Sequence, residues 1–117
     1  MPTIRDLVGA LRRRDGVEAA VVLGRDGLVI DGQASSTLDV EHVAAHVPAV
    51  AAAASALGES AGRGALTSLV VEHEGGISLL SALTPDVLLL VAVRPDADVA
   101  PLLYELRRSR TQLAALV

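Results

Sequence analysis

The chain has 117 residues, the length of one domain, and 51% of them are hydrophobic, which is enough for a sizeable core. The absence of cysteine excludes disulfides and thiolate metal sites, and a net charge of −4 is not the footprint of a nucleic-acid-binding protein. With one tyrosine and neither phenylalanine nor tryptophan, the core must be built from leucine, valine, isoleucine and alanine.

The first third of the chain predicts a helix followed by a β-hairpin. Apolar residues at helical spacing indicate a helix over residues 3–14, which Asp15-Gly16 ends. Two apolar segments, residues 17–23 and 28–34, are typical of strands, and Gly24-Arg25-Asp26-Gly27 is the turn between them.

The middle helix is unusually apolar for a helix on the surface of a domain. Asp39 or Thr37 can cap it, and Pro48 lies inside it, where proline removes a backbone hydrogen bond, so we expect a kink or a break there. The segment from Val47 to Gly58 carries no charge, and a helix that is apolar all round is buried on more than one side. We expect another protein to cover the side of the helix that faces away from its own sheet. The alternative is that this side is exposed to water, since exposed alanines cost little free energy.

Three strands follow, over residues 66–74, 77–83 and 87–93. The last of them has no polar side chain, so both of its faces must be covered. A final helix is expected from about Pro95 to about Leu116.

These elements predict an α+β sandwich built on one five-stranded antiparallel sheet. The most apolar strand, residues 87–93, belongs at the centre with strand 17–23 beside it, and the hairpins place the other strands outside, in the order 2-1-5-4-3. Two helices are expected on one face of the sheet and one on the other. Residues 1–117 are expected to form a single domain.

The middle helix and the third strand together predict an interface between two copies of the chain. An edge strand must be protected or paired, so helix contact and edge-to-edge strand pairing would form a twofold dimer with one continuous sheet. The apolar residues assigned to this interface are Val43, Val47, Val50, Ala53, Ala54, Leu57, Leu69 and Val71.

The chain resembles the Roadblock/dynein light chain family in three features and in their order along the sequence. These are the hairpin from Val21 to Ile30, the alanine-rich helix after Asp39, and the turn Glu74-Gly75-Gly76. The resemblance covers nearly the whole chain. It implies the α-ββ-α-βββ-α Roadblock fold, related to profilin-like and longin domains, and homodimers built on the middle helix and the third strand. It also implies binding and regulation of small Ras-like GTPases, as in bacterial members of the MglB type.

Candidate contacts with a partner are histidines and arginines: His42, His46, Arg63, Arg107, Arg108 and Arg110. The two histidines of the middle helix have the i, i+4 spacing of metal ligands, but no third ligand has an evident position and no metal is expected. Arg63 is not expected to act as an arginine finger, because nothing fixes its direction. The arginines of the first and last helices are expected to form a solvated face, with contact to an acidic partner as the alternative.

No catalytic constellation is present in the sequence. The Gly24–Gly27 turn lacks Gly-Lys-Ser/Thr, and a chain without lysine has no Walker-type phosphate site. His73 should face away from its neighbours Glu72 and Glu74 on a strand and is not an obvious general base. Together with the family resemblance, which implies the GTPase partner, this absence leads us to expect a non-enzymatic, cytoplasmic, homodimeric adaptor for a small Ras-like GTPase. We expect it to use no cofactor and to bind neither nucleic acid nor membrane. The alternatives are a small-molecule sensor of related sandwich fold and a purely structural scaffold subunit.

Overall fold

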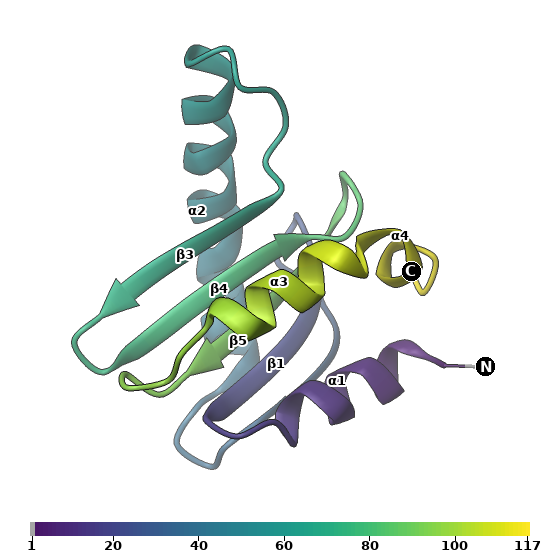
Figure 1. Cartoon of the computed structure of the whole chain (residues 1–117), viewed down its shortest axis with the longest axis vertical. Coiled ribbons are helices and arrows are strands. Elements are labelled where there is room, and N and C mark those ends of the chain that lie inside the picture. The colour runs from purple at the N-terminus through teal and green to yellow at the C-terminus, as the bar shows by residue number, and fades with distance from the viewer. Residues whose placement is uncertain (1) are drawn as a thin grey trace.

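A single sheet of five antiparallel strands, in the order β2-β1-β5-β4-β3, organises the fold (Figure 1). A computed structural model describes residues 2–117 of the chain. In chain order the elements are α1 (Ile4–Arg12), β1 (Val17–Gly24), β2 (Val29–Ala34), α2 (Val40–Ser60), β3 (Ser68–His73), β4 (Gly76–Ala82), β5 (Val87–Val93), α3 (Ala100–Arg108) and α4 (Arg110–Ala114). The strand order and the fold class expected from the sequence are confirmed.

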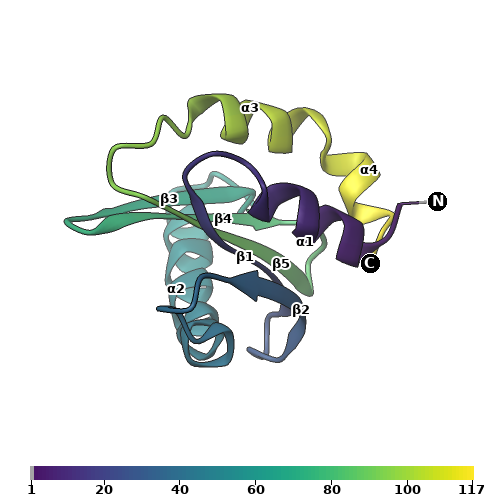
Figure 2. The same cartoon turned by 90° about the horizontal axis from the view of Figure 1, so that it is seen from below.

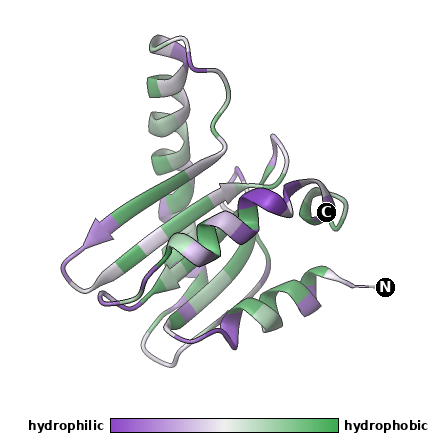
Figure 3. Cartoon of the chain, in the orientation of Figure 1, coloured by the Kyte–Doolittle hydropathy of each residue, from purple (hydrophilic) through white to green (hydrophobic). Residues whose placement is uncertain are grey.

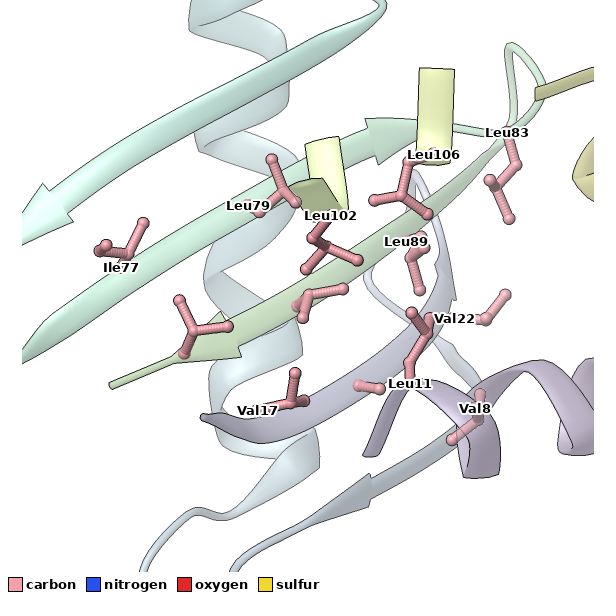
Figure 4. Close-up of a cluster of buried hydrophobic side chains, with 13 residues drawn as sticks. Val8, Leu11, Val17, Val22, Ile77, Leu79, Leu83, Leu89, Leu102 and Leu106 are labelled. Carbon is pink, nitrogen blue, oxygen red and sulfur yellow. The ribbon is translucent and has the colours of Figure 1, made fainter. Parts of the chain in front are cut away.

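The two faces of the sheet have separate cores, because its central strands are apolar on both faces. Figure 2 shows α1, α3 and α4 above the sheet and α2 below it. On the upper face, Val8 and Leu11 of α1 and Leu102 and Leu106 of α3 meet over the sheet (Figure 4). On the lower face, the buried residues of α2 pack on the other side of the same strands. The expected division of two helices on one face and one on the other is confirmed, with α4 added to the first group.

Asp39 caps the N-terminus of α2, and its side chain accepts hydrogen bonds from the backbone N–H groups of Glu41 and His42. The helix then continues without interruption through Pro48. We expected a kink or a break at this proline, and the prediction of a break is wrong. The β1–β2 turn packs onto the helix at Pro48 and over the carbonyl of Ala44, whose intrahelical hydrogen bond proline removes.

The prediction of a single helix at the C-terminal end of the chain is wrong, because Ser109 separates α3 from α4. Ser109 has φ −96° and ψ 8°, outside the helical range, and α4 leaves it in a new direction (Figure 1). After this turn, Leu113 packs against the core that α1 and α3 share.

Candidate interface on α2 and β3

α2 is longer than the part of the sheet that it covers. Figure 1 shows its second half extending past β3, with a loop returning to that strand. Of its 21 residues, Ala44, Val47 and Ala51 are buried. By length and composition alone the helix is apolar enough to cross a membrane, but these three residues hold its first half in the core of the domain. Most of the apolar surface of α2 is therefore left uncovered by the rest of residues 2–117.

The uncovered side of α2 contains most of the residues assigned to the interface. Val50 is 41% exposed and Leu57 is 71% exposed, Ala53 is exposed, and Val43 and Ala54 are half-buried. Figure 3 shows the length of this helix in white to green, with hydrophilic colour at its ends. Val47 differs from the others because it is 5% exposed and belongs to the core beneath the helix.

β3 presents the second half of the candidate interface. Its register with β4 pairs Leu69 with Leu80 and Val71 with Ser78, so both β3 residues face the α2 side of the sheet. Along the described part of the chain no strand pairs with the outer edge of β3. This six-residue strand contains neither proline nor a bulge, so the backbone N–H and C=O groups on its outer edge are available to another strand.

A hollow of about 240 Å³ joins the two elements. Its walls, which define the α2–β3 hollow, are Val43, Val47, Val50, Val71, Leu80, Leu90, His46, His73 and Ser78. Four of the residues assigned to the interface from sequence thus line one cavity. They are joined there by His73, whose Nε2 lies 3.1 Å from Ser78 Oγ. Sequence reasoning set His73 aside, although its alternation with Leu69 and Val71 placed it on the same face of the strand.

The candidate partner contacts do not form one surface. His42 and His46 lie on the exposed side of α2, with their ring centroids 5.4 Å apart in an edge-to-face arrangement. Arg107 and Arg108 are exposed on α3, across the sheet from α2. Arg63 is exposed in the loop between α2 and β3. No group of three potential metal ligands occurs within residues 2–117.

Arg110 is separated from Arg107 and Arg108, although the sequence places them within four positions. It belongs to α4 and lines a second hollow, together with Arg25 of the β1–β2 turn. Arg14 pairs with Glu105, which links the end of α1 to α3 and places the first arginine group on the same face as α3. The arginines of the first and last helices therefore share a face, but Arg110 has a different environment.

Sequence comparison connects the chain with a described family and with an archaeal relative. The family model described as the Roadblock/LC7 domain matches residues 3–92. The chain is 37% identical over 70 residues to the uncharacterized protein MJ0714 of Methanocaldococcus jannaschii. That alignment covers 60% of this chain and 59% of MJ0714, so the chain spans about three-fifths of the length of this curated relative.

Structural comparison finds the same architecture in solved proteins. A Roadblock/LC7 domain from Streptomyces avermitilis superposes with a TM-score of 0.83 at 23% identity, covering 97% of both chains. The gliding protein MglB of Thermus thermophilus superposes with a TM-score of 0.81 at 19% identity, covering 96% of this chain and 86% of MglB. At these identities the likeness establishes the fold.

Proposed function

This chain belongs to the Roadblock/LC7 domain family, and on that premise we propose that it is a non-enzymatic homodimeric adaptor that binds and regulates a small Ras-like GTPase. Family membership supports the GTPase partner, and the uncovered surface of α2 and β3 supports the dimer. We also propose that residues 1–117 act as one domain in the cytoplasm. The packing of the first half of α2 into the core supports this proposal, because it argues against a membrane-spanning role for that helix.

The observation that carries the proposal is the surface of α2. The helix has no charged residue from Val47 to Gly58 and three buried residues in its whole length. Leaving an apolar side chain such as Leu57 in water forgoes about 1.5–3 kcal/mol of burial free energy. The small side chains around it, Ala49, Ala52, Ala53 and Ala56, leave room for a second helix to approach closely.

In the proposed dimer, two copies of α2 pack against each other and the outer edges of two β3 strands pair. The twofold axis brings the same patch of each protomer together, as a symmetric dimer requires. The sheets then continue from one protomer into the other, and the open edge of β3 is paired. The half-buried side chains of Leu69 and Val71 lie beside the helix contact and complete the apolar surface.

The proposed action on the GTPase is a shift in its conformational population. A partner that binds the switch regions more tightly in one nucleotide state stabilises that state by the difference between its two binding free energies. His42 on the exposed side of α2 and the pair Arg107 and Arg108 on α3 remain candidate contacts, whereas His46 lines the α2–β3 hollow and would lie within the dimer surface. His42 and the two arginines lie on different faces of the sheet, so variants at each position locate the docking face.

The test is direct binding to candidate GTPases. Ras-like GTPases encoded in the same genome are purified, loaded with GDP or with a non-hydrolysable GTP analogue, and titrated with the chain by calorimetry. We expect one GTPase to bind in a state-dependent manner and to hydrolyse GTP at a changed rate. Tight binding with an unchanged rate and no preference between states supports a structural scaffold, and absence of binding in both states contradicts the proposal.

A further inference from the structure

The hollow that contains Arg110 shares no lining residue with the α2–β3 hollow and has a different chemistry. It encloses about 340 Å³, in the size range of small-molecule sites. Separate segments of the chain supply its polar lining: Arg25 from the β1–β2 turn, Ser55 and Glu59 from α2, Thr67 before β3, Thr84 from the β4–β5 turn, and Arg110 from α4. We call this cavity the arginine hollow.

Two guanidinium groups in the arginine hollow have no carboxylate partner. The ion pairs found within residues 2–117 use Arg5, Arg14 and Arg94, and none of them involves Arg25 or Arg110. One carboxylate, that of Glu59, lines the hollow, and its side chain belongs to an exposed residue. The lining thus carries two positive charges and one negative charge, an arrangement that favours an anion.

The Nε atoms of the same two arginines lack hydrogen-bond partners. Both atoms are shielded from solvent, and among the described residues neither donates to an acceptor. Arg94 Nε is shielded too, but it lies 3.1 Å from an oxygen of Asp96. A shielded N–H group without an acceptor is unfavourable, so turning either guanidinium group toward an oxygen-bearing ligand in the hollow would relieve that cost.

Hydroxyl groups add donors around the guanidinium groups. Thr84 Oγ1 accepts hydrogen bonds from the backbone N–H groups of Asp86 and Val87, at 3.2 and 3.1 Å. Its own hydrogen therefore remains available for donation. Ser55 Oγ accepts from Nη1 of Arg25 at 3.5 Å, which leaves its hydrogen available in the same way. The remaining lining residues of the hollow are apolar and include Leu66 and Leu83.

We propose that the arginine hollow binds a phosphate group, either of a small phosphomonoester or of free inorganic phosphate, between Arg25 and Arg110. The planar fork of a guanidinium group matches two oxygens of a phosphate, and two such forks match the charge of a phosphate dianion. The hydroxyls of Ser55, Thr67 and Thr84 would donate to the remaining lone pairs. The site goes beyond the proposed function and does not depend on it.

The test is a titration of the full chain with inorganic phosphate and with phenyl phosphate, followed by amide resonances in NMR at constant ionic strength. We expect saturable shifts at Leu66, Thr67, Thr84 and Arg110 with both probes. Tighter binding of phenyl phosphate assigns the apolar lining residues to contact with the organic part of a phosphomonoester. Equal affinity assigns the site to free phosphate, and both outcomes support a phosphate site.

Arg110→Gln is expected to weaken the affinity for both probes by roughly tenfold or more, because it removes one charged donor. Arg107→Gln is the matched control, since Arg107 is exposed on α3 and lies outside the hollow. Arg25→Lys keeps the charge at the β1–β2 turn and is expected to bind more weakly than the unmodified chain while remaining folded. The proposal is overturned if neither probe causes saturable shifts up to about 10 mM, or if Arg110→Gln and Arg107→Gln bind equally.

Discussion

Gly27 in the β1–β2 turn packs against Pro48 in α2 so closely that a Cβ atom on Gly27 would lie 3.2 Å from Pro48 Cγ and 3.7 Å from the carbonyl oxygen of Ala44. Gly27 also has φ +90°, a conformation that side chains other than glycine rarely adopt. The turn thus contacts the helix at the position where proline removes a backbone hydrogen bond.

Gly27→Ala is expected to lower the free energy of unfolding by about 1–3 kcal/mol, through backbone strain and the contact with Pro48. Gly62→Ala is the matched control, because Gly62 has φ +68° and nothing within 4 Å of its added Cβ. This control carries only the backbone cost, about 1 kcal/mol. Urea unfolding measures both, and equal losses in the two variants would mean that the contact with Pro48 contributes nothing.

Ala53→Asp is expected to abolish the dimer by placing an unpaired charge in the proposed helix contact. Such a charge costs roughly 3–5 kcal/mol when buried, which weakens association by more than about a hundredfold. The protomer itself should stay folded, because Ala53 is exposed in it. Size-exclusion chromatography with light scattering measures the mass, and Arg107→Glu on α3 is the control that retains the dimer. An unchanged dimer mass for Ala53→Asp refutes the interface.

Val47→Ala and Val50→Ala are expected to act on different properties of the protein. Val47 is 5% exposed, so its truncation should lower the stability of the protomer by about 1–3 kcal/mol. Val50 is 41% exposed, so its truncation should change protomer stability by less than about 0.5 kcal/mol and weaken the dimer instead. Unfolding at low protein concentration and light scattering at high concentration separate the two effects. The reverse pattern would contradict the placement of these valines.

The ion pair between Asp15 and Arg94 is expected to contribute to acid unfolding. Arg94 donates to both oxygens of Asp15, at 3.1 and 3.0 Å, and these hydrogen bonds lower the pKa of that carboxyl below its ordinary value. A folded-state pKa below the unfolded value of about 3.9 stabilises the protein above that pH, and the contribution is lost as the pH falls through the folded pKa.

Asp15→Asn should therefore lower the melting temperature slightly near pH 7, and the difference from the unmodified chain should vanish toward pH 2. Thermal melts across this range provide the measurement. Glu72→Gln removes an exposed carboxylate from β3 that takes part in none of the ion pairs found in residues 2–117, and it controls for the loss of one negative charge. A melting-temperature difference that persists unchanged at pH 2 would show that Asp15 acts through something other than its charge.

The candidate interface was only partly predictable from the sequence. The absence of charge from Val47 to Gly58 predicted a helix with more apolar surface than one sheet can cover, and the exposed side chains of Val50 and Leu57 agree with it. Helical spacing assigned Val47 to the interface as well, because Val47 belongs to the same row of apolar residues along α2. The sheet beneath α2 covers Val47 and leaves Val50 at the margin, a distinction that no local pattern contains.

The sequence by itself determined the strand order and the fold class, because the apolar residues of β5 require cover on both faces and the short turns leave few ways to pair the remaining strands. Only the tertiary structure decided that α2 continues through Pro48, that the last helix divides at Ser109, and that Arg110 lines one hollow with Arg25 and is separated from Arg107. Hydrophobic periodicity reports the local backbone conformation, whereas the surroundings of Pro48, Leu113 and Arg110 are made by segments far apart in the chain.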